Sequence, residues 1–293
     1  MLANNNKMII NKLAKNSVKS NKKQYGILFF TIVLSAFMLF CVFTIGLTYL
    51  DSSRLQNTRL NGAEYDITTM NGFTSKQVKS LQSNKNIQNV GMESYAGFIK
   101  SSEFDNTVEI GLLWCDETFW NNLMSPARTK LDGHYPQNKN ELMVTKDILK
   151  ACGNENLSVG DSIVLTYENN TGVHTDKFVI SGIWDGYGDK SAGFVSKNFY
   201  DETGYDLKND GILCIKLNRN YVLPTTIQSL EKSLNFSDRQ IFAPTDYIEN
   251  SFKLLLGICG LALVICLSAY LLIYNILYLS LIHISEPTRL RRI

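Results

Sequence analysis

Side chains that could carry acid–base, nucleophilic or metal chemistry are few and widely spaced in this sequence. The three histidines are His134, His174 and His283. His134 and His174 each lie in a turn-like stretch, and neither has another His or Cys at a spacing typical of a metal site. No G-x-S-x-G and no G-x4-G-K-[ST] motif is present, so neither a nucleophile elbow nor a P-loop nucleotide site is expected. The sequence therefore predicts no catalytic, metal-binding or cofactor-binding residues and no bound cofactor.

The acidic pairs, tryptophans and cysteines indicate structural roles. Asp116 and Glu117, like Asp201 and Glu202, are adjacent in sequence and are predicted to be solvated surface. The cysteines are Cys41, Cys115, Cys152, Cys214, Cys259 and Cys266, and the tryptophans are Trp114, Trp120 and Trp184. The cysteines show no C-x-x-C pair and no disulfide framework, so we interpret them as small apolar residues. The tryptophans are expected in a core.

Two long uncharged runs predict helices that cross a membrane. Residues 27–49 form a run of 23 residues and residues 254–278 a run of 25, both without a charged side chain. At 1.5 Å per residue each helix would be roughly 34 to 38 Å long, enough for a hydrocarbon core of about 30 Å. The first run is too long for a cleaved signal peptide and no small-residue cleavage site follows, which favours a retained anchor. Asn275 is the most polar residue of the second run.

The charge distribution predicts the orientation in the membrane. Residues 1–24 carry six lysines and no acid, and the positive-inside rule places them in the cytoplasm. Residues 51–251 carry 26 of the 27 acids against 19 Lys and Arg, a net charge of −7, and are expected outside. The overall charge of +2 is a sum over both sides of the membrane, so it gives no indication of nucleic-acid binding.

The basic segment before the first run has two interpretations. Apolar residues and lysines between residues 8 and 23 recur at helical spacing, which favours an amphipathic helix lying on the inner leaflet. A simple cluster of lysines that fixes the topology would give the same composition. In the second run, Gly257, Gly260, Ser268 and Ala269 permit close packing, so that face either contacts another helix or faces lipid.

The stretch between the runs predicts an α+β domain without internal repeats. Its first part indicates a split β-α-β unit, in which Thr74 caps the helix: a strand at 62–70, the helix after Thr74, and strands at 87–90 and 93–100. The middle part indicates a β-rich subdomain. Its expected elements are a helix at 114–122, a turn at 133–136, a strand at 141–144, a helical turn at 147–152, and strands at 162–167 and 177–184 joined at 169–172. A strand at 212–217 and a helix at 225–234 follow.

The final residues, 279–293, read LSLIHISEPTRLRRI and have the form of translated sequencing adapter. They back-translate without strain into a transposase-type adapter followed by a short index. We therefore expect the natural sequence to depart from this one after Tyr278, and a further part of the protein to follow there. His283 and the arginines of this tail therefore indicate nothing about function or topology.

Several stretches in a fixed order resemble permeases of FtsX/MacB-type ABC transporters. They are LAKNSVKS at 13–20, GHYP at 133–136, ELMV at 141–144, LSVGDSIV at 157–164 and FVISGI at 178–183. Each stretch alone is weak, and their order and spacing over residues 7–278 make the resemblance more specific. It implies two transmembrane helices flanking a MacB-like extracytoplasmic core domain.

The resemblance also implies partners and a mechanism. Such permeases dimerise with themselves or with a related chain, and they dock onto a separate ATP-binding subunit. ATP hydrolysis there moves the membrane helices and the extracytoplasmic domain, a process termed mechanotransmission. The implied substrates are peptides, antibiotics or lipoproteins. The expected divisions are a cytoplasmic helix at 1–24, a first span at 25–50, an extracytoplasmic domain at 51–251 and a second span at 252–278, in a bacterial inner membrane.

Two other classes of protein share parts of this pattern. A membrane sensor would also place an extracellular ligand-binding domain between two helices, with a cytoplasmic signalling domain beyond the second. The long apolar run up to Tyr278 and the permease-like stretches favour the permease. A membrane-anchored enzyme would need site residues that the sequence does not contain.

Overall fold

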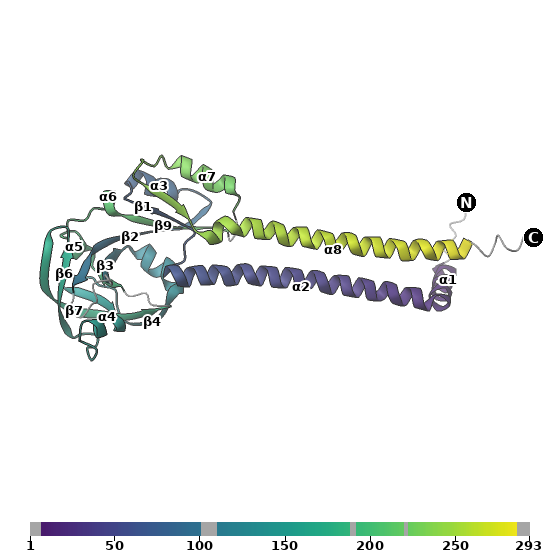
Figure 1. The fold of residues 1–293 in the computed structure, drawn as a ribbon, viewed down its shortest axis with the longest axis horizontal. Helices are drawn as coiled ribbons and strands as arrows, with labels where there is room; N and C mark the ends of the chain where they lie inside the picture. Colours follow the sequence, from purple (N-terminus) through teal and green to yellow (C-terminus); the bar gives the residue numbers. More distant parts are fainter. Residues whose placement is uncertain (1–6, 101–109, 188–191, 220–221, 286–293) are drawn as a thin grey trace, which may run out of the picture. The chain divides into compact units, whose positions relative to one another are not determined.

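The computed structural model describes residues 7–100, 110–187, 192–219 and 222–285. The chain divides into two compact units. The first, which we call the helical unit, consists of residues 1–50 and 253–293, and the second, the central domain, of residues 51–252. Figure 1 labels the helices and strands of each unit.

Three helices supply the helical unit. They are α1 (Lys7–Ser20), α2 (Lys22–Asn61) and α8 (Asp246–Ser285), of which α2 and α8 continue into the central domain. Both α2 and α8 contain a stretch long and apolar enough to cross a membrane. The basic segment is helical, as one interpretation of the sequence expected, since Lys7–Ser20 forms α1. The tail predicted to be foreign falls on the end of α8 and on residues 286–293, which lie outside the described residues.

Within the helical unit, α2 and α8 meet at a glycine. A Cβ atom added at Gly46 would lie 2.6 Å from Cδ1 of Ile258, so a larger residue here would force the Ile258 side chain to move. Ile258 and Ala262 are each 7% exposed, in contrast to the exposed leucines around them. Gly257 and Gly260 have no neighbour within 4 Å of an added Cβ atom. The helix contact therefore forms at Gly46 and not at the glycines of the second run. Asn275 and Ser268 are exposed, and Ala269 is half-buried.

The central domain contains ten strands among the described residues. They are β1 (Ile67–Met70), β2 (Ile87–Lys100), β3 (Ile110–Cys115), β4 (Arg128–Gly133), β5 (Glu141–Thr145), β6 (Ser162–Asn169), β7 (Gly172–Gly186), β8 (Gly193–Val195), β9 (Ile212–Leu217) and β10 (Ile241–Pro244). The helical segments are α3 (Ser75–Gln82), η1 (Phe119–Leu123), η2 (Ser125–Ala127), α4 (Lys146–Ala151), α5 (Lys197–Tyr200), α6 (Leu207–Asp210) and α7 (Pro224–Ser233).

Four strands form two interlocked split β-α-β units. Their order is β10-β1-β9-β2, and β9 is antiparallel to both β1 and β2. The chain runs β1-α3-β2 with β9 between the two strands, and later β9-α7-β10 with β1 between them. This is the ferredoxin-like arrangement, with the β-rich middle inserted between its halves. The predicted split β-α-β units are confirmed, and the strand that completes the second one, β10, was not assigned from the sequence.

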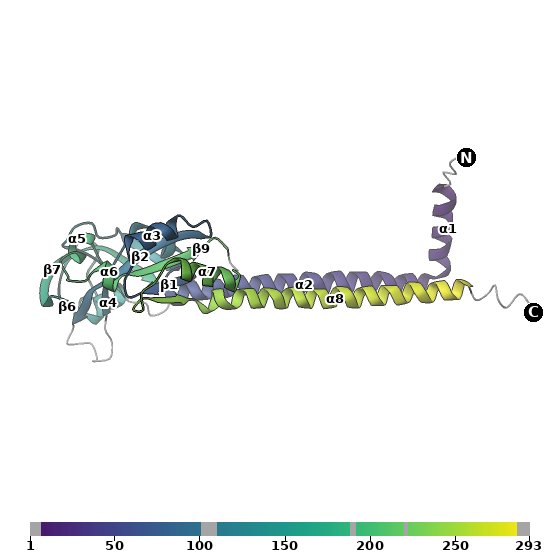
Figure 2. The same cartoon turned by 90° about the horizontal axis from the view of Figure 1, so that it is seen from above.

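The two faces of this sheet carry different packing. On β9, Leu213, Ile215 and Leu217 point to one face because side chains alternate along a strand. There they pack with Leu81 of α3 and Ile227 of α7. These two helices lie over this sheet in Figure 1, and Figure 2 shows them from above. Cys214 points to the opposite face and packs with residues of η1, including Phe119 and Leu123.

The inserted middle closes into a barrel. Going round, β2 pairs with β3, β3 with β8, β8 with β5, β5 with β7, β7 with β6, and β6 again with β2. A closed sheet leaves no edge strand and encloses its own core. That core holds fully buried residues, among them Leu112, Leu142, Val144, Ile180 and Val195. β4 adds to the outside of the ring through β7.

A single long strand joins the two subdomains. β2 pairs with β9 from Ile87 to Glu93 and with β3 from Glu93 to Ile99. The sequence predicted two strands, 87–90 and 93–100, and the structure shows one continuous strand with a bulge between Tyr95 and Gly97. Because β2 belongs to both the sheet and the barrel, the two share a backbone.

Most predicted elements are confirmed, with a few corrections. α3 begins after Thr74, whose side chain forms a capping box with Gln77. The turn after β4 begins at Gly133, where φ is +86° and an added Cβ would lie 2.2 Å from the oxygen of Ser181. The helix predicted over 114–122 is wrong at its start, because Trp114 lies in β3 and η1 begins at Phe119. The strand predicted from Gly62 begins only at Ile67.

The barrel core makes a direct stability prediction. Leu142→Ala removes a side chain that is 0% exposed and should lower the free energy of unfolding by about 2 to 5 kcal/mol. Leu131→Ala, the same change at a side chain 44% exposed, should alter it by less than about 0.5 kcal/mol. All three tryptophans lie in the central domain, so urea unfolding of the full chain in detergent, followed by tryptophan fluorescence, reports on it. Equal effects of the two substitutions would contradict the assigned core.

Candidate functional site at the helix base

Neither of the two described histidines belongs to a group of metal-binding side chains among the described residues. His134 is exposed, and its Nδ1 lies 3.0 Å from the backbone oxygen of Tyr135. His174 Nε2 lies 2.8 Å from the hydroxyl of Thr171, and its ring stacks on that of Tyr167. Within the part of the chain that the structure describes, no three His, Cys, Asp or Glu side chains gather as a metal site would require.

The two acidic pairs differ in their environment. Asp201 forms an ion pair with Lys197, Glu202 with Lys139, and both acids are exposed as expected. Asp116 is partly buried, so its assignment to the solvated surface is wrong. Its Oδ1 accepts hydrogen bonds from the backbone N–H groups of Met92 and Phe119, each at 2.8 Å, which fixes the start of η1 against β2. Burial raises the pKa of Asp116 despite these bonds.

The tryptophans and two cysteines are structural, as predicted. Trp114, Trp120 and Trp184 are at most 7% exposed. Cys115 and Cys214 are buried on the same face of the sheet as η1. Burial raises the pKa of both thiols well above the usual value, which keeps them protonated and poorly nucleophilic.

The end of α2 is built into the central domain through ion pairs. Thr58 is only 3% exposed although it lies in the last turn of α2. Arg54 Nη1 lies 3.9 Å from Glu64 Oε1, and Lys216 Nζ of β9 lies 2.5 Å from Glu64 Oε2. Glu64 and Lys216 side chains are 16% and 20% exposed, so this pair is screened less than a surface pair. Glu64 therefore ties the end of α2 to the central sheet.

Asp66 ties the same sheet to the start of α8. Its carboxylate Oδ2 accepts a hydrogen bond of 2.7 Å from the N–H of Leu217, and its backbone oxygen accepts one of 2.8 Å from Thr245. Asp66 is 9% exposed. Burial, assisted by the negative charge of Glu64, raises its pKa to about 6, although the Leu217 N–H, Lys216 and Arg54 act in the opposite direction.

The first turns of α8 lie in the core of the central domain. Thr245 caps the helix, since its Oγ1 accepts from the N–H of Ile248 at 3.4 Å, and Asp246 and Glu249 suit the positive end of the helix dipole. Ile248 is 0% exposed and belongs to the same cluster as Ile67 of β1 and Ile215 of β9. We call this set the helix base: Arg54, Glu64, Asp66, Lys216, Thr245 and Ile248.

The helix base connects the ends of α2 and α8 to the sheet through ion pairs, hydrogen bonds and packing. It holds no nucleophile with an activating base, and its charges are paired or hydrogen-bonded. A rotation or shift of either helix end would have to lengthen the bonds around Glu64 and Asp66 or displace Ile248 from its packing. Because packed cores switch between discrete arrangements and do not deform continuously, such a shift reaches β1 and β9. Sequence inspection missed this site, and its only signal was the acidic pattern at 64 and 66 just after the first span.

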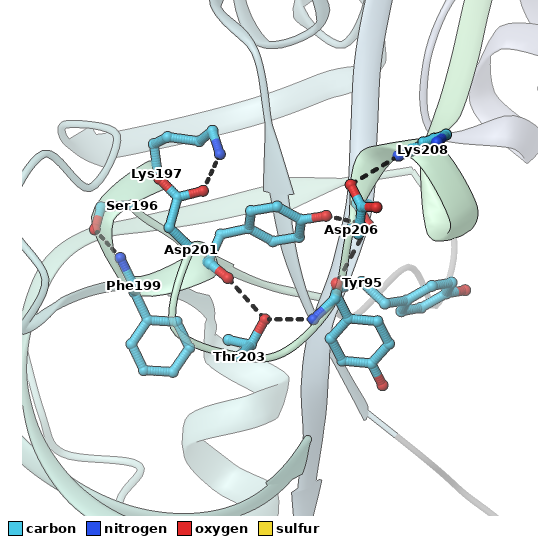
Figure 3. A network of polar contacts seen from close by, with 11 residues as sticks. Tyr95, Ser196, Lys197, Phe199, Asp201, Thr203, Asp206 and Lys208 are labelled. Carbon is cyan, nitrogen blue, oxygen red and sulfur yellow. Dashed lines mark hydrogen bonds and ion pairs between the residues drawn. The ribbon is translucent and has the colours of Figure 1, made fainter. Parts of the chain in front are cut away.

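A second feature is a cleft on the barrel of about 380 Å³. Tyr167, Phe178 and Phe199 form its aromatic side, and His174, Asp176 and Glu202 contribute polar groups. Phe199 lies on α5, and Glu202 lies in the turn that follows it. In Figure 3 the hydroxyl of Ser196 accepts a hydrogen bond from the N–H of Phe199. The hydroxyl of Thr203 donates to the backbone oxygen of Tyr200 and accepts from the N–H of Tyr205. The polar groups here satisfy one another: Tyr167 donates to Asp176 and Glu202 pairs with Lys139.

Two solved structures of transporter domains are similar to this chain. The periplasmic region of MacB from Actinobacillus actinomycetemcomitans aligns with a TM-score of 0.42 and 14% identity, over 66% of this chain and 95% of that one. The extracellular domain of the noncanonic ABC-type transporter YknZ from Gram-positive bacteria aligns with a TM-score of 0.39 and 11% identity, over 60% and 98%. At these values the likeness is distant. The chain matches no family model and no curated protein.

The raised pKa of Asp66 makes a pH prediction. Because its pKa is about 6 in the folded protein and 3.8 in a free side chain, the folded protein binds a proton that the unfolded chain releases between these values. The stability that Asp66 contributes is therefore fully present below about pH 4 and is lost as the pH rises through 6. Relative to Asp66→Asn, the parent chain should lose roughly 2 to 3 kcal/mol of unfolding free energy between pH 4 and pH 8.

The measurement is urea unfolding at a series of pH values for the full chain in detergent. Glu64, Arg54 and Lys216 face Asp66 and remain in place in the variant. Asp132→Asn, at an exposed position on β4, serves as the control and should keep the parent's pH profile. Parallel profiles for the parent chain and Asp66→Asn would show that Asp66 does not titrate as its burial requires.

Proposed function

We propose that this chain is the membrane-spanning permease part of an ABC transporter of the FtsX/MacB type. In this proposal a separate subunit hydrolyses ATP, and the chain converts the resulting helix movement into movement of the central domain. The observation that carries the proposal is the helix base. Both α2 and α8 contain a membrane-length apolar stretch. The first turns of α8 pack into the core of the central domain, and Arg54 near the end of α2 pairs with Glu64 of the same domain.

The arrangement of charge supports the orientation in the proposal. Residues 1–24 are cytoplasmic, residues 25–50 and 252–278 cross the bacterial inner membrane, and residues 51–251 are extracytoplasmic. Lys12, Lys15 and Lys19 on α1 are exposed and can meet anionic headgroups of the inner leaflet. The net charge of −7 over residues 51–251 is consistent with the opposite side.

The coupling step follows from the contacts. ATP-driven closure of the partner subunit displaces α2 and α8, which change their packing where Gly46 meets Ile258. The displacement reaches Glu64 through Arg54, and it reaches Asp66 through Thr245. Both acids bond to β9, at Lys216 and Leu217, and β9 pairs with β2, which continues into the barrel. The chain therefore has a continuous, bonded route from helix ends to barrel.

Partners and cargo belong to the same proposal. The permease dimerises with a second copy or with a related permease and moves peptides, antibiotics or lipoproteins. No catalytic step is assigned to the chain itself, since hydrolysis takes place on the ATP-binding subunit. The lipid bilayer is the medium of both spans.

The first experiment reads the parent gene through codon 278 and purifies its full product. We expect further hydrophobic helices after Tyr278, a neighbouring gene for an ATP-binding subunit, and co-purification of that subunit with ATPase activity. A histidine-kinase or methyl-accepting region after Tyr278, without an ATP-binding partner, would overturn the permease proposal in favour of a sensor.

A matched pair of glycine variants tests the coupling. Gly46→Leu forces α2 and α8 apart at Ile258 and should reduce ATP-dependent transport while the complex still assembles. Gly257→Leu adds the same side chain where nothing lies within 4 Å and should leave transport unchanged. Equal transport by both variants would contradict a role for the helix contact.

A further inference from the structure

A groove on the ferredoxin-like subdomain gathers positive charge without acidic side chains. It has a volume of about 540 Å³ and lies among the turn after β1, helix α3, helix α6 and the loop between α7 and β10. Its cations are Lys76, Lys208 and Arg239. No Asp or Glu lines it among the residues that the structure describes. This groove lies within the central domain and plays no part in the helix base.

The three cations of the groove contrast with five other cations of the domain, which form ion pairs. Arg54, Lys100, Lys139, Lys197 and Lys216 each have a carboxylate within 4 Å. Lys76, Lys208 and Arg239 are exposed, and within the described residues none of them forms such a pair. Since the domain as a whole is acidic, with a net charge of −7 over residues 51–251, a local cluster of three uncompensated cations produces a positive field that favours anions.

The floor of the groove is held by two interlocked amides. Gln77 is 7% exposed and donates to the backbone oxygen of Leu234 at 3.1 Å. Gln240 donates to the oxygen of Gly72 at 2.7 Å, and the two side-chain amides lie 3.2 Å apart. These bonds join the loop after β1, helix α3 and the loop before β10. Lys76 and Arg239 are thus carried on segments whose relative positions are fixed before any ligand arrives.

Two asparagines with positive φ shape the rim. Asn71, with φ +66°, and Asn235, with φ +48°, are the non-glycine residues with positive φ among those described, and both line the groove. Asn235 occupies the position after the C-cap of α7, where this conformation is common. Asn71 donates from Nδ2 to the backbone oxygen of Arg239 at 2.7 Å, which anchors the segment that carries the guanidinium.

We propose that this groove binds a phosphate group of an extracytoplasmic ligand. A phosphate monoester carries close to two negative charges, and inorganic pyrophosphate carries more. Both have several acceptor oxygens, which matches three cations better than a single carboxylate does. Arg239 can donate two parallel hydrogen bonds to such a group, while Lys76 and Lys208 act as point charges. The phosphate can belong to a free anion or to a lipid headgroup. The inference goes beyond the proposed transport function and rests on it only for the side of the membrane on which the groove lies.

The test uses the full chain in nanodiscs of zwitterionic lipid, titrated calorimetrically with inorganic pyrophosphate. We expect saturable binding that weakens with added salt, and a loss of about tenfold in affinity for each of Lys76→Gln, Lys208→Gln and Arg239→Gln. Lys130→Gln and Lys150→Gln remove the same charge from exposed positions on β4 and α4 and should leave the affinity within about twofold.

A second titration with a water-soluble short-chain phosphatidic acid identifies the source of the phosphate. Tighter binding than pyrophosphate, lost in the same three variants, indicates a lipid headgroup. Binding of pyrophosphate alone indicates a free anion. The proposal is overturned if neither probe binds, if citrate binds as tightly as pyrophosphate, or if the control variants lose as much affinity as the groove variants.

Discussion

The burial of Ile248 beside Ile67 and Ile215 is the contact on which the rest of the structure depends. It places the first turns of a membrane-length helix inside the core of a folded domain. Such a helix would ordinarily fray at its end, where backbone N–H groups lack partners. Here Thr245 caps it and is itself bonded to Asp66 of the sheet. The first turns of α8 and the sheet therefore share one packed core.

This constraint explains why charged residues are tolerated at the helix base. Glu64 and Asp66 are both largely buried, which is costly for carboxylates unless they are paired or hydrogen-bonded. Glu64 has two cations, and Asp66 has the N–H of Leu217. Removing one partner leaves a buried charge uncompensated, so the network holds together or fails as a whole. A network of this kind can transmit a displacement of the helix ends while its ion pairs and hydrogen bonds stay intact.

The shared strand β2 connects the ferredoxin-like sheet to the barrel. Because its backbone pairs first with β9 and then with β3 and β6, the ferredoxin-like sheet and the barrel cannot move entirely independently. The bulge between Tyr95 and Gly97 is where the strand changes its surroundings.

Local patterns predicted those elements that local chemistry determines. The Thr74 cap, the strand at Ile212–Leu217 and the hairpin turn at 169–172 all have short-range signals, and all are present. The strands β4, β8 and β10 are short and exist because of long-range pairing, which leaves little pattern in the sequence. Closure of the barrel depends likewise on the register between β6 and β2. Asp116 was misread because its buried hydrogen bonds come from Met92, 24 residues earlier in the chain.

The candidate site was even less accessible to sequence reasoning. Glu64, Lys216 and Thr245 are ordinary surface residue types, separated by more than 25 residues along the chain. Only the pairing of β1 with both β9 and β10 brings them together. The three cations of the phosphate-binding groove are separated in the same way, and no motif links them.

The most direct test of the account is hydrogen exchange on the full chain in nanodiscs, followed by mass spectrometry. The central claim is that the ends of both helices, residues 51–61 and 246–252, belong to the cooperative core of the central domain. The account predicts that amides in these segments exchange as slowly as those of β1 and β9, because they open only when the domain unfolds. Exchange at the rate of a fraying helix end, while β1 and β9 stay protected, would contradict it.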